Sequence, residues 1–217
     1  MAMQAMSSGP HQGAQVFQAG VPLDRARAVG ILLHGRGDRA ENILQLAKAF
    51  RAEGVAWLAP QAAGNTWYPN RFIAPIASNE PWLSSALGVV GDLVAQVESA
   101  GIDGTKILLG GFSQGACLAL EYVVRHPARF GGVAGLSGGL IGPPGTTWAT
   151  DGSLAGTPIF LGCSDVDFHI PKERVLESAE VLTALGAQVE TILYPNMDHI
   201  INEDELARVR KLIAGIL

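Results

Sequence analysis

The amino-acid sequence predicts an α/β fold with a mostly parallel central sheet that is covered by helices on both faces. Short apolar runs alternate with longer segments of helical periodicity, and this alternation is typical of such a sheet. Only 16% of the 217 residues are charged while 48% are hydrophobic, as expected when both faces of the strands are hidden. We expect one domain over residues 1–217, in which residues 1–14 form a poorly ordered N-terminal extension.

The strands and helices follow from these two patterns. Six apolar runs bounded by glycine or proline are the expected core strands, at residues 29–33, 55–58, 106–109, 132–136, 158–161 and 189–193. Residues 15–17 are a candidate N-terminal edge strand. Helical periodicity predicts five helices, at residues 40–51, 82–99, 114–125, 171–185 and 204–216. Asn202 is expected to cap the last helix, with Glu205 closing a capping box.

Two segments fit neither pattern. Residues 61–81 contain aromatic residues and prolines without any helical or alternating period. A long loop of this kind in a compact domain is usually functional, so we interpret it as an ordered binding loop. Residues 130–150 carry no charge and are rich in glycine, which favours a buried strand and a long turn over a membrane helix. Residues 142–156 receive no interpretation.

Charge and cysteine usage narrow the function classes. Fifteen Lys and Arg against twenty Asp and Glu leave a net charge of −5, which offers no basic surface for nucleic acid. Cys117 and Cys163 lie in apolar stretches without metal-ligand spacing, so we expect buried thiols and neither a metal nor a cofactor. The N-terminus lacks the pattern of a secretory signal, and no membrane span is expected. A cytoplasmic location follows as the default expectation, and a homodimer is left open.

The motif that carries chemistry is a strand, a G-x-S-x-G sequence and a helix. Gly111-Phe112-Ser113-Gln114-Gly115 occupies the predicted turn between the strand at 106–109 and the helix at 114–125. Such a sharp turn exposes the serine hydroxyl, and the flanking glycines relieve crowding. The N–H groups that begin the helix face any negative charge that develops on a substrate oxygen. Ser113 is therefore the candidate nucleophile.

A serine nucleophile requires a base and an acid that orients the base. In this arrangement the chain order is serine, acid, histidine, with the acid and the histidine each following a later strand. Asp165 and Asp167 follow the strand at 158–161, and His199 follows the strand at 189–193. The carboxyl ends of parallel strands meet at one edge of a sheet, so these residues are expected to converge.

Among five histidines, only His199 has the required order and the required loop. The other four are interpreted as surface residues (His11 and His126), a loop residue (His169) and a residue that precedes the serine (His34).

A second N–H donor is expected from residues 34–38, which follow the first core strand. The glycines of this loop also imitate a dinucleotide-binding fingerprint. That fingerprint requires an acidic residue about 20 positions on, at the end of the next strand, and residues 58–61 contain none. We therefore favour an oxyanion hole formed by the backbone N–H groups of Arg36 and Gln114.

With residues 32–38, 111–115 and 194–199, the chain resembles the phospholipase/carboxylesterase family of α/β-hydrolases, small esterases that include the acyl-protein thioesterases. The resemblance implies an α/β-hydrolase fold without a separate cap domain. It implies Ser113 as nucleophile, His199 as general base, and Arg36 and Gln114 as oxyanion donors. The family often has leucine where Arg36 stands, which should alter the rim of the site more than its mechanism.

The acid remains a choice between two aspartates. The family pattern D-x-x-V-P resembles Asp167-Phe168-His169-Ile170-Pro171, whereas Asp165 has a G-x-x-D spacing from Gly162. We favour Asp167 as the catalytic acid and interpret Asp165 as a turn residue.

The resemblance implies a serine carboxylesterase that acts on small or medium hydrophobic acyl esters through an acyl-enzyme. The alternative is a lysophospholipase or an acyl thioesterase with the same triad. A dienelactone hydrolase is disfavoured because that group usually has a cysteine nucleophile, and a non-catalytic binding module is disfavoured by the intact triad. The candidate substrate-binding residues are Trp67, Tyr68, Phe72, Trp82, Phe168 and Met197.

Overall fold

The central feature of the fold is a seven-stranded sheet, described here in a computed structural model that covers residues 9–217. The strand order is β1-β3-β2-β4-β5-β6-β7. Only β1, at one edge, is antiparallel to its neighbour, and the other neighbouring strands are parallel. The strands are β1 (Val16–Gly20), β2 (Ala28–Leu33), β3 (Val55–Pro60), β4 (Ile107–Phe112), β5 (Gly132–Leu136), β6 (Pro158–Ser164) and β7 (Gln188–Tyr194). All six predicted core strands and the edge strand are confirmed.

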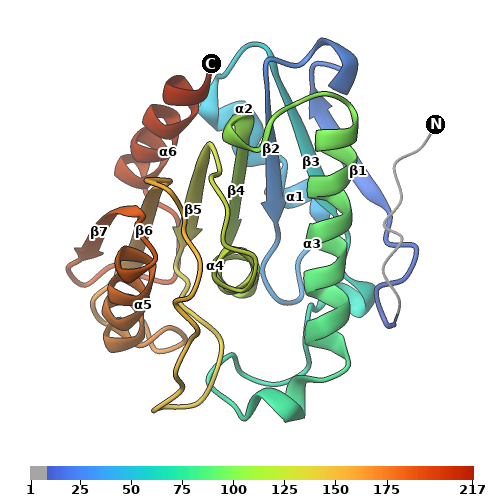
Figure 1. The fold of residues 1–217 in the computed structure, drawn as a ribbon. Helices are drawn as coiled ribbons and strands as arrows, with labels where there is room; N and C mark the ends of the chain where they lie inside the picture. Colours follow the sequence, from blue (N-terminus) through green and yellow to red (C-terminus); the bar gives the residue numbers. More distant parts are fainter. Residues whose placement is uncertain (1–8) are drawn as a thin grey trace.

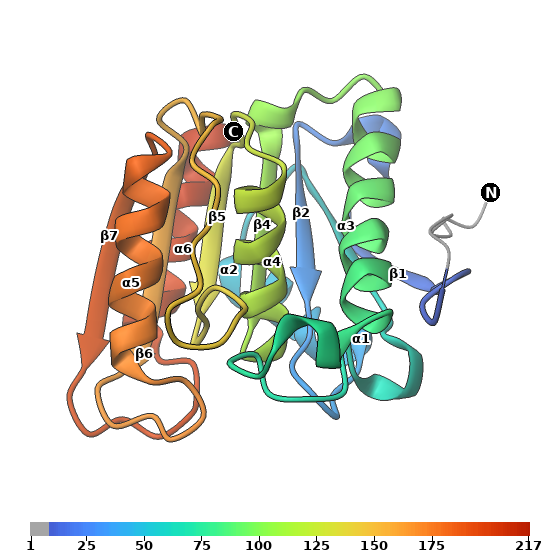
Figure 2. The same ribbon diagram turned by 60° about the horizontal axis from the view of Figure 1, so that its bottom comes forward.

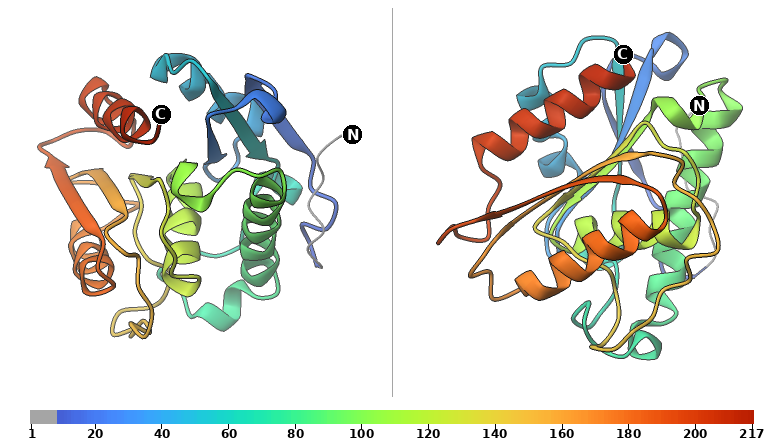
Figure 3. Two further views of the ribbon diagram at one scale, coloured as in Figure 1. Left: turned by 45° about the horizontal axis from the view of Figure 1, so that its top comes forward. Right: turned by 60° about the vertical axis from the view of Figure 1, so that its left-hand side comes forward.

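Helices cover both faces of the sheet. They are α1 (Ala40–Ile43), α2 (Gln45–Phe50), α3 (Trp82–Ser99), α4 (Gln114–Arg125), α5 (Lys172–Ala184) and α6 (Glu203–Ile216). Helices α3, α4 and α5 lie on one face, and α1, α2 and α6 lie on the other (Figures 1 and 3). The predicted α/β-hydrolase architecture is confirmed, as one compact domain without a separate cap. In the described part of the chain, no helix is both long and apolar enough to cross a membrane.

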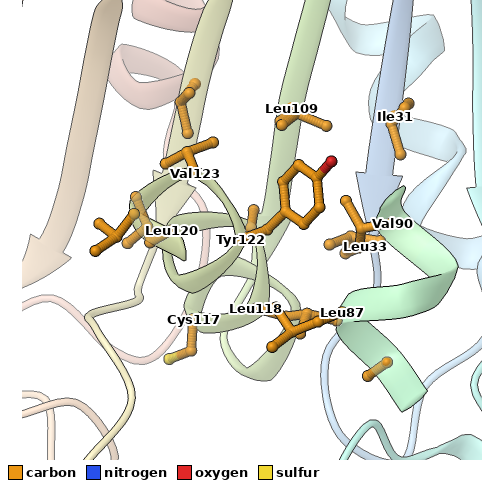
Figure 4. Close-up of a cluster of buried hydrophobic side chains, with 14 of the residues drawn as sticks. Ile31, Leu33, Leu87, Val90, Leu109, Cys117, Leu118, Leu120, Tyr122 and Val123 are labelled. Carbon is orange, nitrogen blue, oxygen red and sulfur yellow. The ribbon is translucent and has the colours of Figure 1, made fainter. Parts of the chain in front are cut away.

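Each face of the sheet has its own hydrophobic core. Ile31 and Leu33 of β2 point into the larger core, under α3 and α4, while Leu32 points into the core under α1, α2 and α6. Figure 4 shows part of the larger core, which includes Leu118 of α4 and Leu87 of α3. Burial of both faces accounts for the low charged fraction of the sequence.

The predicted helix over residues 40–51 is two short helices. The break lies at Leu44, because the N–H of Ala47 donates to the carbonyl of Leu44, three residues back, at 3.1 Å. The predicted start of α6 is confirmed: the Asn202 side chain accepts from the N–H of Glu205, and the Glu205 side chain accepts from the N–H of Asn202.

The expectation of a poorly ordered extension over residues 1–14 is wrong for residues 9–14, and residues 1–8 lie outside the described part. His11, expected at the surface, is 1% exposed. Its Nδ1 accepts from the N–H of Ala63 at 3.1 Å, and its Nε2 lies 2.9 Å from the carbonyl of Trp67. These two backbone contacts hold the N-terminal turn against the loop that follows β3.

The glycine-rich segment after β5 is held by two charged side chains. Arg174 of α5 donates to the carbonyls of Leu140 and Gly142, at 2.8 and 2.7 Å. Glu121 of α4 accepts from the N–H of Ile141 at 2.9 Å. Both charged side chains are buried, so they satisfy backbone groups that hydrophobic neighbours could not.

Candidate active site

Ser113 lies at the sharp turn between β4 and α4. Its φ of 53° and ψ of −118° are unusual for a residue with a side chain. The N–H of Ser113 donates to the carbonyl of Leu136 at 2.9 Å, which fixes the turn to β5. A Cβ atom at Gly115 would overlap the backbone of Leu33, and one at Gly111 would overlap the backbone of Gly115. Both flanking glycines are therefore required for this turn.

His199 lies between a hydroxyl and a carboxylate. Its Nε2 is 2.9 Å from Oγ of Ser113, and its Nδ1 is 2.6 Å from Oδ2 of Asp167. A carboxylate only accepts hydrogen bonds, so Nδ1 carries the proton and Nε2 accepts from the serine hydroxyl. The rings of Phe112 and His169 flank His199, with centroids at 4.8 and 4.9 Å. The loops that carry these residues gather at the carboxyl ends of the strands (Figure 2).

Asp167 is fixed by several donors. Its side chain is fully buried, and its Oδ1 accepts from the N–H groups of His169 and Ile170 at 2.8 and 3.0 Å. Burial acts to raise the pKa of Asp167, but the hydrogen bond with His199 and those two N–H groups outweigh it and lower the pKa. Asp167 is consequently a carboxylate at neutral pH.

Asp165 has a different partner. Its Oδ1 accepts from the N–H of Asn196 at 2.8 Å, and its own N–H donates to the carbonyl of Tyr194 at 3.0 Å. Asp165 therefore ties the loop after β6 to the loop after β7. The geometry brings Asp167, rather than Asp165, to His199.

The two expected oxyanion donors lie beside Ser113. Arg36 and Gln114 line the same cavity as the serine, and a Cβ atom added at Gly35 would lie 3.6 Å from the Cβ of Ser113. Within residues 9–217, the backbone N–H groups of Arg36 and Gln114 have no acceptor in the hydrogen-bond pattern, whereas that of Gly37 donates to Asn65. An oxygen on the substrate could accept both free donors.

The Gln114 side chain organises the loop opposite the serine. Its Oε1 accepts from the N–H of Trp67 at 2.9 Å and from the hydroxyl of Thr66 at 3.2 Å. Its Nε2 donates to the carbonyl of Tyr68 at 2.8 Å. One residue thus offers a backbone donor to the site and holds the loop of residues 66–68 with its side chain.

Ser113 and His199 open onto a cavity of about 610 Å³. Of the residues expected to bind substrate, Tyr68 and Phe72 line this cavity. The structure differs from the expectation at four others, which do not line it: Trp67, Trp82, Phe168 and Met197.

The reason differs among these four residues. Trp67 is fully buried and donates its indole N–H to the carbonyl of His34 at 2.9 Å, so it supports the loop from behind. Trp82 packs against His11, with ring centroids 5.4 Å apart. Phe168 is 77% exposed beside the site, and Met197 contacts the Asn202 side chain.

The lining residues that were not predicted as site residues include Arg71, Phe112, Cys117 and His169. Cys117 follows Ser113 by four positions, which places both on one side of the α4 N-terminus, and this spacing is a signal in the sequence. Burial raises the pKa of the Cys117 thiol to about 12, so it stays protonated. In the part of the chain that the structure describes, no group of His, Cys, Asp and Glu residues has the arrangement of a metal site.

Comparisons with known proteins show what this chain is similar to. The crystal structure of a phospholipase/carboxylesterase from Dyadobacter fermentans matches with a TM-score of 0.89 and 39% identity, over 99% of this chain and 100% of that one. Acyl-protein thioesterase 1 from Gibberella zeae is 34% identical over 127 residues, 56% of this chain and 53% of that protein. A probable carboxylesterase, SOBER1-like, from Arabidopsis thaliana is 27% identical over 198 residues, 83% of this chain and 76% of that protein.

The extent of these matches differs. The matched part spans about half the length of the acyl-protein thioesterases. The model of the phospholipase/carboxylesterase family, in contrast, matches residues 15–217. The chain belongs to the phospholipase/carboxylesterase family.

Proposed function

We propose that this protein is a serine carboxylesterase that cleaves esters of small or medium hydrophobic acyl groups through an acyl-enzyme intermediate. The observation that carries the proposal is the hydrogen-bonded series Ser113, His199, Asp167 at the mouth of the cavity. This is the arrangement of nucleophile, general base and orienting acid that acyl transfer requires.

The first half of the reaction forms the acyl-enzyme. His199 Nε2 takes the hydroxyl proton while Ser113 Oγ attacks the ester carbonyl. Asp167 holds the imidazole and stabilises its positive charge. The N–H groups of Arg36 and Gln114 donate to the oxyanion, and one such donor contributes roughly 3 kcal/mol to the transition state. His199 then gives the proton to the departing alcohol.

The second half regenerates the enzyme. His199 takes a proton from a water molecule, whose oxygen attacks the acyl carbonyl. The same two N–H groups stabilise the second oxyanion. The bond between the acyl carbon and Ser113 Oγ breaks, the proton returns to the serine, and the carboxylic acid leaves.

The cavity supports the choice of a hydrophobic acyl group. Tyr68, Phe72, Phe112 and Cys117 supply apolar surface beside Ser113. A volume of about 610 Å³ is in the range of pockets for small ligands.

Thioester cleavage is the second candidate function, because curated relatives are named acyl-protein thioesterases. The same triad serves both reactions. Matched oxygen esters and thioesters of one acyl series separate them: an esterase should have the higher kcat/KM on the oxygen esters, and a thioesterase the reverse.

The direct test is labelling by a fluorophosphonate together with hydrolysis of 4-nitrophenyl butanoate. Wild type should be labelled and active. Ser113→Ala should lose both properties and keep its melting temperature, whereas Ser99→Ala, on the exposed side of α3, should keep all three. Labelling or hydrolysis that persists in Ser113→Ala contradicts the proposal.

A further inference from the structure

We propose that the site prefers esters that carry a second, anionic group such as a carboxylate, bound by Arg36 and Arg71 at the edge of the cavity. This inference rests on the proposed esterase function and names the class of substrate. Two arginines line the cavity, although the protein as a whole is acidic, with a net charge of −5.

Arg36 is held in place without being neutralised. Its guanidinium donates to the carbonyl of Pro69 at 2.8 Å, the carbonyl of Asn70 at 2.5 Å and the hydroxyl of Thr66 at 3.1 Å. All three acceptors are uncharged. A guanidinium has five N–H donors, so Nε–H and one Nη–H remain for a ligand, and the positive charge is retained.

Arg71 is presented from a fixed backbone. The side chain of Asn79 is fully buried and accepts from the N–H of Asn70 at 2.8 Å. The same side chain donates to the carbonyl of Arg71 at 3.2 Å. Asn79 therefore fixes the N–H of Asn70 and the carbonyl of Arg71. The Arg71 side chain is exposed, lines the cavity, and has no ion-pair partner among residues 9–217.

The two arginines lie on one wall. Arg36 binds the carbonyls of residues 69 and 70, and Arg71 is the next residue along the chain. Outside the cavity, four arginines have a carboxylate partner: Arg125, Arg174, Arg208 and Arg210. Among residues 9–217, five others outside the cavity have no ion pair, so it is their place in the cavity that distinguishes Arg36 and Arg71. Unpaired guanidinium groups in a cavity bind carboxylates through two parallel hydrogen bonds.

Carboxylates near the cavity offset only part of this charge. Asp38 is the one acidic residue among the lining residues, and its Oδ1 accepts from the uncharged Asn42 side chain at 2.5 Å, so one negative charge faces two guanidinium groups. Asp167 is buried behind His199 and is satisfied by its own donors.

Either half of the substrate can carry the anion. Arg36 supplies one of the proposed oxyanion donors through its backbone N–H. The same residue therefore places a guanidinium near the reacting carbonyl. An anionic group on the acyl chain or on the alcohol could reach this wall. The experiment therefore has two arms.

Each arm compares a carboxylate with its neutral carboxamide. The acyl arm uses the mono-4-nitrophenyl esters of adipic acid and of adipamic acid. The alcohol arm uses 4-carboxyphenyl and 4-carbamoylphenyl butanoate. We expect the carboxylate to have a kcat/KM about tenfold above the carboxamide on one arm. The preference should shrink when NaCl rises from about 20 mM to about 500 mM, because salt screens exposed charges.

Substitutions of Arg71 test whether this arginine contributes to the preference for the carboxylate. Arg71→Gln should lower the carboxylate-to-carboxamide ratio toward one, with Arg36 still able to bind the carboxylate, and Arg71→Glu should lower it further. Arg25→Gln is the matched control, since Arg25 is exposed and lies before β2, away from the cavity. Its ratio should equal that of wild type.

The outcomes separate this inference from the proposed function. Hydrolysis of the carboxamides with a ratio of one or below on both arms overturns the anion preference and leaves the esterase intact. A preference that Arg71→Gln and Arg71→Glu do not change overturns the assignment to this wall. Absence of hydrolysis on every substrate, with no fluorophosphonate labelling, overturns the esterase function itself.

Discussion

Oδ2 of Asp167 lies 2.6 Å from Nδ1 of His199, whereas Asp165, two residues earlier in the same loop, binds the N–H of Asn196. The two aspartates therefore have separate tasks. Asp167 orients the His199 ring, and Asp165 joins the two loops that carry Asp167 and His199.

Substitution of each aspartate by asparagine should separate these tasks. Asp167→Asn favours the wrong tautomer of His199, and we expect kcat to fall by about 10⁴. Asp165→Asn keeps an oxygen that can accept from Asn196, so its kcat should change by less than about tenfold. Steady-state kinetics on 4-nitrophenyl butanoate measures both. Equal losses of kcat in the two variants would contradict the separate roles of Asp165 and Asp167.

The fold was predictable because its signals are local. The core strands β2 to β6 are short, mainly apolar runs, and each stops before a polar residue, whereas β7 alternates polar and apolar residues over its first half. The convergence of Ser113, Asp167 and His199 was also predictable, since parallel strands bring their carboxyl ends to one edge. The family pattern then favoured Asp167 over Asp165, which the geometry matches.

The parts that sequence analysis missed depend on contacts between distant residues. His11 is buried because it bonds to Trp67, 56 positions away, and no periodicity reports such a contact. Trp67 looks like a binding residue by composition, yet Gln114 and His34 hold it behind the cavity wall. The break at Leu44 is a change of one hydrogen bond within an otherwise helical pattern.

Gly115→Ala tests the packing of the serine turn. The added Cβ would overlap the backbone of Leu33 and His34, so we expect a loss of about 3 kcal/mol in the free energy of unfolding, with loss of esterase activity. Gly215→Ala is the control, because a Cβ there meets open space within α6, and it should be neutral or stabilising. Urea unfolding compares them, and a stable, active Gly115→Ala would refute the close approach.

Glu205 should make stability depend on pH. Burial raises its pKa to about 7, the nearby Asp204 adds to this, and the N–H of Asn202 opposes it. The folded protein thus binds the proton more tightly than the unfolded chain, for which the pKa is near 4.5. The contribution of Glu205 to the free energy of unfolding is fully present below about pH 4.5 and is lost as the pH rises through about 7. It amounts to at most about 3 kcal/mol.

Glu205→Gln isolates this effect. Glutamine retains an acceptor for the N–H of Asn202 and does not titrate. The free energy of unfolding should be measured for wild type and for Glu205→Gln from about pH 4.5 to about pH 8. As the pH rises, wild type should lose stability relative to Glu205→Gln. A difference that stays constant across this range would show that the carboxyl is not held in its protonated form.

Gln114→Ala separates the two roles of one residue. The backbone N–H beside Ser113 remains, but the side-chain bonds to residues 66–68 are lost. Because this loop places Tyr68 in the cavity wall, we expect KM for 4-nitrophenyl butanoate to rise by about tenfold while kcat falls less. Gln45→Ala, whose exposed side chain contacts only its own helical region, should keep both constants. A loss confined to kcat would instead mean that the side chain acts on the position of the oxyanion donors, since those donors affect the transition state and not the bound ester.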